Sequence, residues 1–357
     1  MKTAEIIVVG TGSIARGVIY GLSHAPGISL RVAIIGRSLA KASEIAVLAN
    51  ARAAIVGTSV ICQPFSISRF NAAEFSKLFR SLKPKVILLA ASLQSPWEVT
   101  QEENVWTRLI SHGGFGITLP LQLKLAAEVS RAASDLQASV VNASYPDAVN
   151  VVLDHVGLRM TCGLGNAAII EAFCRSKFGA RKLGSAKKDV RVVAHHGQVG
   201  PWLGGKASGR QPRIWIQSHE VPAWQLNPSL GPIGEELNSV TTSTAIPLLL
   251  ALLSGATVHT SIPGVAGFPG GYPFLLKQGK FSLRLPPGVS PAEAIAHNKK
   301  GERLDGLDLR ADAKFVGKAR QALNAANFEY AQGFSFSEWP RVCERMASLR
   351  DRLRITT

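Results

Sequence analysis

Short apolar runs alternate with amphipathic stretches through the first 155 residues. The apolar runs predict strands at 5–9, 30–35, 53–62, 86–90 and 140–141. The stretches between them predict helices at 41–50, 72–82 and 119–133. Strands that alternate with helices in this way predict a parallel sheet covered by helices on both faces.

The pattern changes after about residue 160, and the loops at 197–232 are rich in Pro and Gly. The predicted strands there are 190–194, 257–262, 272–277 and 280–285. The predicted helices are 167–178, 237–253, 311–327 and 335–352. This mixture indicates a second, α+β part of the chain.

The first strand leads directly into the pattern Gly10-x-Gly12-x-x-Ala15, and a helical stretch follows. Gly10 permits a tight turn, Gly12 lets the backbone approach a pyrophosphate, and Ala15 lets the helix pack closely on the strand. The backbone N–H groups around Ser13 and Ile14 would then bind the phosphates. The alternative interpretation is an ordinary glycine-rich turn.

With this motif at its start, the chain is expected to have two domains. Residues 1–155 would form a dinucleotide-binding Rossmann domain, a doubly wound parallel sheet. Residues 156–357 would form the α+β domain that binds the substrate and completes the catalytic site.

The end of the second predicted strand bears on the choice of cofactor. Sites that select NAD place an acid there, but this chain has Arg37 and Ser38, which suit the 2′-phosphate of NADP. NADP is therefore favoured over NAD, with a surface arginine stacked on the adenine as the alternative. Ala90, Ala91 and Asn142, at the ends of other strands, are expected to line the same cofactor.

The net charge of +16 reflects 40 Lys and Arg residues against 24 Asp and Glu residues. These positive residues are spread along the chain without a nucleic-acid-binding motif, so an anionic cofactor and substrate are favoured over nucleic acid. The apolar run Ala245–Leu253 contains Pro247 and is too short to span a bilayer, and no signal peptide is recognised. A cytoplasmic protein without a membrane partner is expected.

Four scattered cysteines, without a Cys-x-x-Cys pair, predict reduced thiols. The His, Cys and acidic residues have no metal-ligand spacing, so no metal site is expected.

The order of these parts resembles the lactate/malate dehydrogenase superfamily over most of residues 5–300. Besides the glycine motif, the segments that carry the resemblance are Val140–Asp147, Gly163–Asn166, Val192–Gln198 and Thr242–Ala245. They resemble, in turn, the strand that ends in an Asn-Pro-x-Asp turn, the opening of a helix, the segment of the catalytic histidine and the substrate-side helix. The resemblance implies a nicotinamide-dependent dehydrogenase that forms a homodimer or homotetramer.

One catalytic position is kept, since the histidine of the family falls on His196. The asparagine that binds the substrate carbonyl falls on Tyr145, and the aspartate that orients the histidine falls near Ile169. The arginine that binds the substrate carboxylate falls near Ala172, and residues 97–98 replace the arginine of the mobile loop. Lactate and malate are therefore not the expected substrates.

His196 is the first candidate for proton exchange, because the pKa of histidine lies near neutrality. His195 would point to the opposite side if strand geometry continues through it. Glu171 is a candidate for the acid that orients His196, with a surface salt bridge as its alternative. Asp147 is a second option, with a helix cap as its alternative. Tyr145 could donate to a substrate carbonyl or imine, or could be a packed aromatic residue.

Asn166 and Thr242 are candidates for contact with the small-molecule substrate. Lys206, Arg210 or Arg213 could replace the missing arginine. The expected function is that of an NADP(H)-dependent oxidoreductase acting on a carbonyl or hydroxy substrate. Two alternatives stay open, an opine-type or imine-reducing dehydrogenase and a catalytically inactive dinucleotide sensor.

Overall fold

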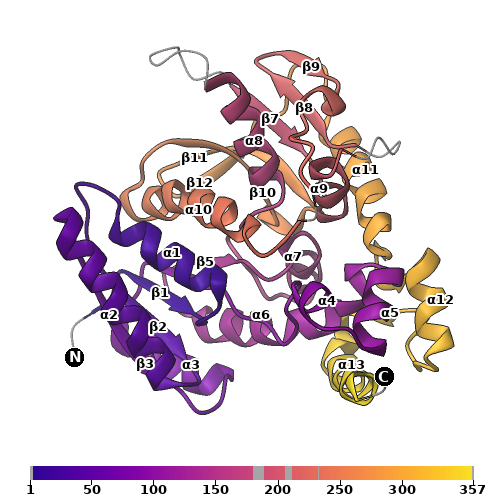
Figure 1. Cartoon of the computed structure of the whole chain (residues 1–357), viewed down its shortest axis with the longest axis horizontal. Coiled ribbons are helices and arrows are strands. Elements are labelled where there is room, and N and C mark those ends of the chain that lie inside the picture. The colour runs from indigo at the N-terminus through magenta and orange to yellow at the C-terminus, as the bar shows by residue number, and fades with distance from the viewer. Residues whose placement is uncertain (1–2, 180–188, 206–210, 232, 356–357) are drawn as a thin grey trace.

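The main sheet has six parallel strands in the order β3-β2-β1-β4-β5-β6. Figure 1 shows its strands β1, β2 and β3 beside helices α1, α2 and α3. The computed structural model describes residues 3–179, 189–205, 211–231 and 233–355. The strands of the main sheet are β1 (Ile6–Val9), β2 (Ser29–Gly36), β3 (Ser59–Ser66), β4 (Val86–Leu89), β5 (Ser139–Asn142) and β6 (Cys162–Gly163). This arrangement confirms the predicted Rossmann-type fold.

Helices cover both faces of this sheet. Helices α1 (Ser13–Ser23) and α2 (Leu39–Val56) lie on one face, and α3 (Ala72–Leu82) and α6 (Leu119–Ala133) lie on the other. The first half of the chain also forms α4 (Glu98–Gln101), α5 (Val105–Gly113) and α7 (Pro146–His155). Successive strand residues point to opposite faces. In β1, Ile6 and Val8 join the core under α1 and α2, whereas Ile7 and Val9 join the core under α3 and α6. The continuous apolar runs of the sequence follow from this burial on both faces.

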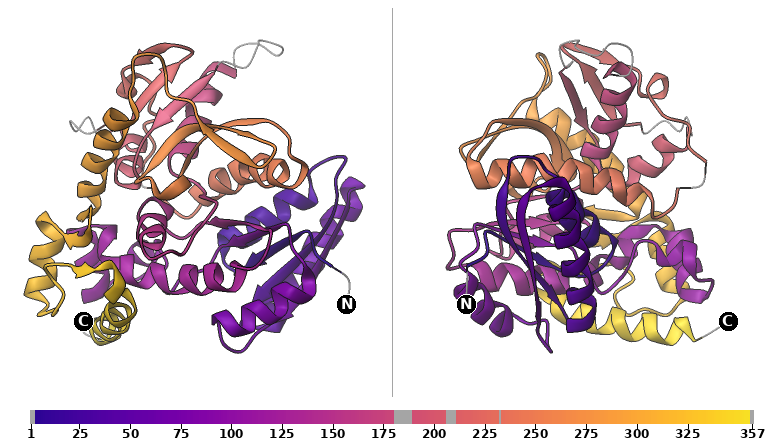
Figure 2. Two further views of the ribbon diagram at one scale, coloured as in Figure 1. Left: turned by 180° about the vertical axis from the view of Figure 1, so that it is seen from behind. Right: turned by 60° about the vertical axis from the view of Figure 1, so that its left-hand side comes forward.

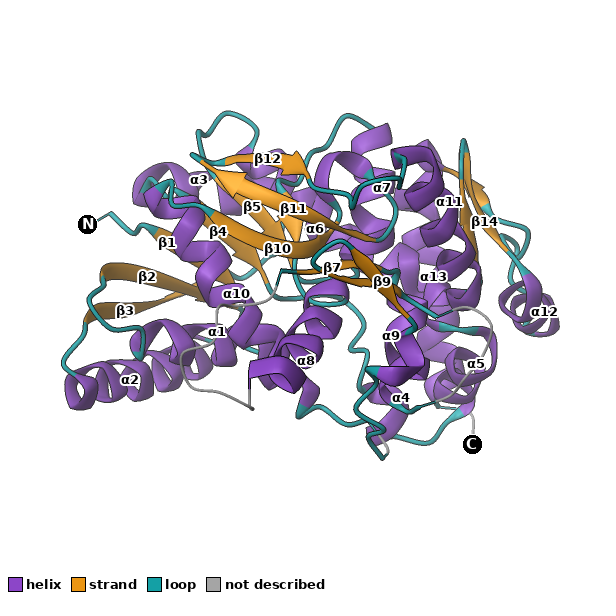
Figure 3. Cartoon of the chain, turned by 90° about the horizontal axis from the view of Figure 1, so that it is seen from above, coloured by secondary structure: helices purple, strands orange, loops and turns teal. Residues whose placement is uncertain are grey.

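The second half of the chain adds small antiparallel sheets and further helices, coloured by type in Figure 3. Its strands are β7 (Val190–Val193), β8 (Arg213–Ile216), β9 (His219–Val221), β10 (Val258–Pro263), β11 (Gly271–Lys277), β12 (Lys280–Leu283), β13 (Leu307–Leu309), β14 (Asp312–Phe315) and β15 (Phe334–Ser335). Its helices are α8 (Ala167–Gly179), α9 (His196–Leu203), α10 (Leu237–Ser254), α11 (Pro291–Glu302), α12 (Gly317–Ala325) and α13 (Trp339–Arg354).

The C-terminal segment returns to the N-terminal half of the molecule, as both views of Figure 2 show. Helix α13 packs on α5 and α6, and α12 packs on α5. Buried residues between Leu307 and Leu349 belong to the core on the face of the main sheet that α3 and α6 cover. Strand β6 also joins that sheet, although it lies beyond residue 155. The structure therefore differs from a simple division of the chain at residue 155.

Several predicted elements have different bounds in the structure. Residues 53–56 continue helix α2, since alanines favour helix, and Gly57 ends it with φ of 74°. The predicted loop 197–232 contains α9, β8 and β9, while α4, α5 and α11 were not predicted. The predicted helix 311–327 begins as strand β14, because Ala313 and Phe315 alternate with exposed residues.

Helix α10 contains no charged residue, and its length and composition also match a membrane span. In the structure it packs against α1, α8 and β10. Thr242 of α10 meets Gly17 of α1, where a Cβ would lie 2.7 Å from the threonine methyl group. This close approach explains the small residue in α1.

Candidate functional site

The glycine motif forms the turn between β1 and the start of α1. Gly10 has φ of 130°, and a Cβ there would collide with the carbonyl oxygen of Ala90. Gly12 caps α1, and a Cβ on it would meet no atom within 4 Å. Ala15, in the first turn of α1, is fully buried. The N-terminus of α1 is therefore open for an anion, between strands β1 and β4, where the strand order reverses.

Arg37 and Ser38 lie beside this turn. Gly36 ends β2 so close to the turn that a Cβ would lie 2.8 Å from the methyl group of Thr11. Both Arg37 and Ser38 are exposed. Ser38 caps α2 by accepting a hydrogen bond from the backbone N–H of Lys41. The hydroxyl can still donate to a ligand while it accepts this bond.

The other predicted cofactor contacts differ in how far they are buried. Ala90 and Ala91 are half-buried directly after β4, at the same edge as Gly10. Asn142 is fully buried, and its side-chain N–H₂ group donates to the Ser144 carbonyl and to Asn150 Oδ1. Both amide hydrogens of Asn142 are thus used inside the protein. The structure gives it a role in shaping the turn after β5 in place of the predicted cofactor contact.

His196 begins helix α9, and Asp147 fixes its backbone. The Oδ1 atom of Asp147 accepts a hydrogen bond of 2.9 Å from the His196 N–H. The other oxygen of Asp147 accepts from the Asn166 amide. His195 is the N-cap of the helix, so strand geometry ends there. Strand alternation would have placed the two histidines on opposite sides. Because the strand ends at His195, both imidazoles instead lie near the Asp305 carboxylate.

Asp305 supplies the carboxylate at the centre of the site. Its Oδ2 atom lies 2.9 Å from Nδ1 of His196, and it accepts a hydrogen bond of 2.9 Å from the Tyr145 hydroxyl. Asp305 lies in a short 3₁₀-helix after α11, 109 residues from His196. Gly197 permits this approach, because a Cβ there would already lie 3.2 Å from Asp305 Cγ.

Aromatic rings surround the imidazole of His196. The ring centroid of Tyr145 lies 5.1 Å away, and that of Phe115 also lies 5.1 Å away. Tyr145 has φ of 48°, an unusual conformation for a large residue. It is buried, whereas the His196 side chain is 31% exposed. Among these groups, His196 is therefore the one that a small molecule can reach most readily.

The charges in this cluster raise the pKa of His196 and lower the pKa of Asp305. Burial alone would lower the pKa of His196, but the charge of Asp305 and the bond to it raise the pKa. Burial alone would raise the pKa of Asp305, yet the charges and hydrogen bonds of His196 and His195 bring it well below its usual range. The geometry of the pair thus stabilises the charged form of each partner.

Glu171 is not the acid beside His196. Its carboxylate forms an ion pair of 2.6 Å with Arg175 and accepts a hydrogen bond of 2.5 Å from the Ser261 N–H. Two residues along a helix correspond to about 200° of rotation, so Glu171 leaves α8 on a different side from Ile169. Its carboxylate thus joins α8 to β10.

The two predicted substrate contacts, Asn166 and Thr242, lie in different parts of the structure. Asn166 lies at the site, half-buried, with φ of 51° and its amide on Asp147. Thr242 is buried between α10 and α1, where its hydroxyl donates to the Ser239 carbonyl. A substrate role for Thr242 is therefore not supported by its position.

No arginine or lysine in the described part of the chain bonds to Asp147, Asp305 or His196. Arg213, a predicted replacement for the missing arginine, is paired with Glu220 and Glu293. Lys206 and Arg210 lie outside the described residues.

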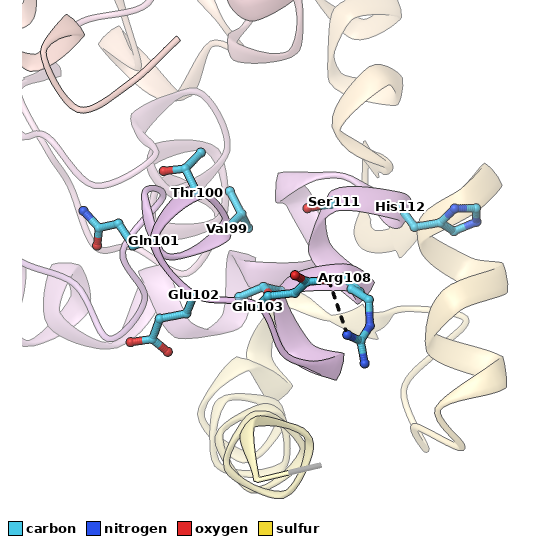
Figure 4. A pocket seen from close by; sticks show the side chains of 9 residues that line it. Val99, Thr100, Gln101, Glu102, Glu103, Arg108, Ser111 and His112 are labelled. Carbon is cyan, nitrogen blue, oxygen red and sulfur yellow. Dashed lines mark ion pairs between the residues drawn. The ribbon is translucent and has the colours of Figure 1, made fainter. Parts of the chain in front are cut away.

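A pocket of about 610 Å³ lies on the outer surface between α4 and α5. Figure 4 shows its lining side chains, including Glu103 and Arg108, which form an ion pair of 3.8 Å. None of the residues of the His196 cluster lines it. It is therefore separate from the candidate site.

The fold is shared with solved lactate and malate dehydrogenases. Three of them are MGS-M5, a lactate dehydrogenase from a Medee basin deep-sea metagenome library, and the malate and lactate dehydrogenases of Cryptosporidium parvum. Their sequence identities to this chain are 13%, 14% and 13%, with TM-scores of 0.50, 0.51 and 0.50. The alignments cover 91%, 85% and 85% of this chain and 99%, 98% and 98% of theirs.

No protein-family model and no curated protein sequence matches the chain. The likeness to the dehydrogenases is therefore one of fold, and it confirms the structural resemblance inferred from the sequence motifs. The Cryptosporidium lactate dehydrogenase was solved with lactic acid and NAD.

Sequence reasoning missed Asp305. The residue stands in a Leu-Asp-Gly turn that carries no catalytic pattern, and nothing local links it to a histidine 109 residues away. The resemblance places the aspartate at Ile169 of α8, far along the chain from Asp305. Only the return of the C-terminal segment brings the carboxylate to His196.

The His196–Asp305 pair predicts a defined pH window for stability. Asp305, with its lowered pKa, stabilises the fold fully above its ordinary pKa of 3.8 and loses this effect as the pH falls through its folded value. His196, with its raised pKa, stabilises fully below 6.5 and loses this effect as the pH rises through its folded value. The unfolding free energy that His196→Gln removes should therefore be largest between pH 3.8 and 6.5.

Urea unfolding of both proteins across pH 3–10 measures this difference. His112→Gln, an exposed histidine on α5, is the matched control and should give a small, nearly flat difference. A difference for His196→Gln that stays constant across the whole pH range would contradict the pairing.

Proposed function

We propose that this protein is an NADP(H)-dependent dehydrogenase or reductase. The observation that carries the proposal is one edge of the sheet that combines two features. One is the open N-terminus of α1 after Gly12, and the other is a histidine–carboxylate pair beyond β5. A dinucleotide bound along this edge would bring its reactive ring toward the pair.

The cofactor, when bound, supplies the hydride at C4 of its nicotinamide ring. The fit of the cofactor rests on Gly10 and Gly12, because the first turns tightly and the second leaves the helix amides uncovered. Ser13, Ile14 and Ala15 begin the helix that faces the phosphates. Arg37 and Ser38 would bind the 2′-phosphate, by charge and by hydroxyl donation.

His196 exchanges the proton in this proposal. In the direction of reduction, Nε2 donates a proton to the carbonyl oxygen, and His196 takes it back when a hydroxyl is oxidised. Asp305 orients the ring through Nδ1 and stabilises the imidazolium, as the aspartate does in Ser-His-Asp triads. Tyr145 fixes the same carboxylate through its hydroxyl.

The substrate in this proposal is a neutral carbonyl compound or its alcohol. A 2-oxo acid needs a cation to bind its carboxylate, and no arginine or lysine in the described segments bonds to the cluster. Phe115, half-buried against His196, offers apolar contact area for such a substrate. An absolute requirement for an amine cosubstrate would favour the imine-reducing alternative.

Cofactor selectivity gives the first prediction. NADPH should bind more tightly than NADH, and Arg37→Asp should weaken NADPH binding by about ten- to a hundredfold, since a charge-assisted bond contributes about 1.5–3 kcal/mol. Nicotinamide fluorescence at moderate salt measures both affinities. Arg320→Asp, an exposed change on α12 with the same loss of charge, should leave binding within about twofold.

If neither nucleotide binds, the oxidoreductase proposal fails. If both variants lose NADPH affinity equally, the net positive charge of the protein explains the binding. Arg37 would then have no specific role in it.

Catalysis gives the second prediction. With a neutral carbonyl substrate found by screening with NADPH, His196→Gln should lower kcat by about 10²–10⁴-fold without weakening NADPH. His112→Gln is again the control and should keep full activity. In the wild type, reduction should fall as the pH rises through the raised pKa of His196, since the donor must be protonated. Tight NADPH binding without turnover of any carbonyl or imine would support the sensor alternative instead.

We further propose a homodimer formed through α2. This helix exposes Val47, Leu48 and Ile55 with relative exposures of 66%, 47% and 87%. Three large apolar side chains on one short surface are typical of a contact that is buried in an assembly. Multi-angle light scattering should give twice the chain mass, and Ile55→Glu should shift it to the monomer. A monomeric wild type at micromolar concentration would contradict this proposal.

A further inference from the structure

The carboxylate of Asp305 faces a second histidine that the proposed chemistry does not use. Nδ1 of His195 lies 3.4 Å from the same Oδ2 atom that contacts His196 and Tyr145. The same nitrogen lies 3.3 Å from the backbone N–H of Gly197. It cannot donate to the carboxylate and accept from Gly197 at once, so the presence of a proton on Nδ1 decides which contact His195 makes.

The surroundings of His195 act on its charge in two opposite ways. Its side chain is fully buried, and Nε2 has no hydrogen-bond partner in the described part of the protein, and both facts by themselves oppose the charged form. Helix α11 packs directly on it, since a Cβ at Gly301 would lie 2.6 Å from the His195 Cβ. The next residue, Glu302, is also fully buried.

One oxygen of Glu302 accepts a hydrogen bond of 2.7 Å from the Leu309 N–H, and the other has no partner among the described residues. A buried carboxylate oxygen without a donor favours a positive charge nearby. The charge of Glu302 acts on His195 and that of His195 on Glu302.

The titratable groups that face His195 come from four elements. They are Tyr145 and Asp147 around the start of α7, Glu302 of α11, Asp305 after α11, and His196 of α9. Burial would lower the pKa of His195, but the bond to Asp305 and the charges of Asp147, Asp305 and Glu302 raise it. Burial raises the pKa of Asp147 and of Glu302, whereas the pKa of Asp305 is lowered, so Asp305 is the main counter-charge of the two imidazoles.

We propose that His195 carries a proton at neutral pH and shares the Asp305 carboxylate with His196, so that it is a positioning residue that makes His196 release its proton more readily. This inference rests on the proposed proton exchange at His196. Without a second cation, His196 would face the whole charge of Asp305 and would retain its proton to higher pH. A general acid works best when its pKa lies near the working pH.

The test is a titration of the histidine ring signals by NMR, with ¹³C-labelled histidine in the cofactor-free protein. His195→Asn removes the charge but keeps an oxygen that can accept from Gly197, because asparagine is also a good N-cap. Its expected effect is a rise of the His196 midpoint by about half a unit or more, which is at least a threefold gain in proton affinity. The wild-type His195 signal should titrate above pH 7.

A second variant keeps the inference testable if His195→Asn does not fold. Glu302→Gln removes one of the charges that favour the imidazolium, so the His195 midpoint should fall while His196 retains its pair with Asp305. His297→Asn is the matched control, because this histidine contacts Gln198 and does not touch Asp305. It should leave the midpoints of both His195 and His196 unchanged.

Activity adds an independent readout. In His195→Asn, the falling limb of the reduction profile should move to higher pH, whereas a merely structural role would lower the rate without moving the limb. An unchanged His196 midpoint in His195→Asn, or a neutral His195 at pH 7, overturns the inference. The NMR titration needs neither cofactor nor turnover, so its outcome is separate from any failure of NADPH binding.

Discussion

A carboxylate buried away from water must find polar partners, and three polar groups lie within 3.4 Å of Asp305 Oδ2. The hydroxyl of Tyr145 and the two adjacent imidazoles come from different parts of the chain, and only the folded protein brings them together. If the carboxylate were removed, His196 would lose its orientation and His195 its counter-charge. The geometry of the site therefore depends on this one anion.

The fold places Asp305 there by close backbone contacts. A Cβ at Gly114 would lie 2.8 Å from the Asp305 carbonyl oxygen, and one at Gly116 would collide with it. The glycine-rich segment between α5 and α6 is packed on the turn that carries Asp305. Strands β13 and β14, which follow this turn, tie it to the core that α3 and α6 share with the main sheet. The C-terminal segment thus forms part of the candidate site.

The sequence was sufficient to predict the sheet and the glycine turn, because both are local patterns with a strict physical basis. Gly10, Gly12 and Ala15 behave as the motif requires, and His196 lies at the predicted edge. The partner acid could not be predicted, since the contact between His196 and Asp305 spans 109 residues and leaves no periodic signal. Strand alternation also failed at His195, because a helix cap interrupted it.

The resemblance to dehydrogenases guided the fold correctly and the acid incorrectly. It directed attention to α8, where Ile169 occupies the aspartate position and Glu171 binds Arg175. A shared fold at 13–14% identity thus does not determine which side chains form the site.

The central claim is that the cofactor loop and the His196–Asp305 pair form one site. A nuclear Overhauser measurement between the nicotinamide H4 protons of bound NADPH and the ¹³C-labelled ring of His196 tests it most directly. A cross-peak that disappears in His196→Gln, with NADPH still bound, is the predicted result. Bound NADPH without any contact between its nicotinamide and His196 would contradict the account.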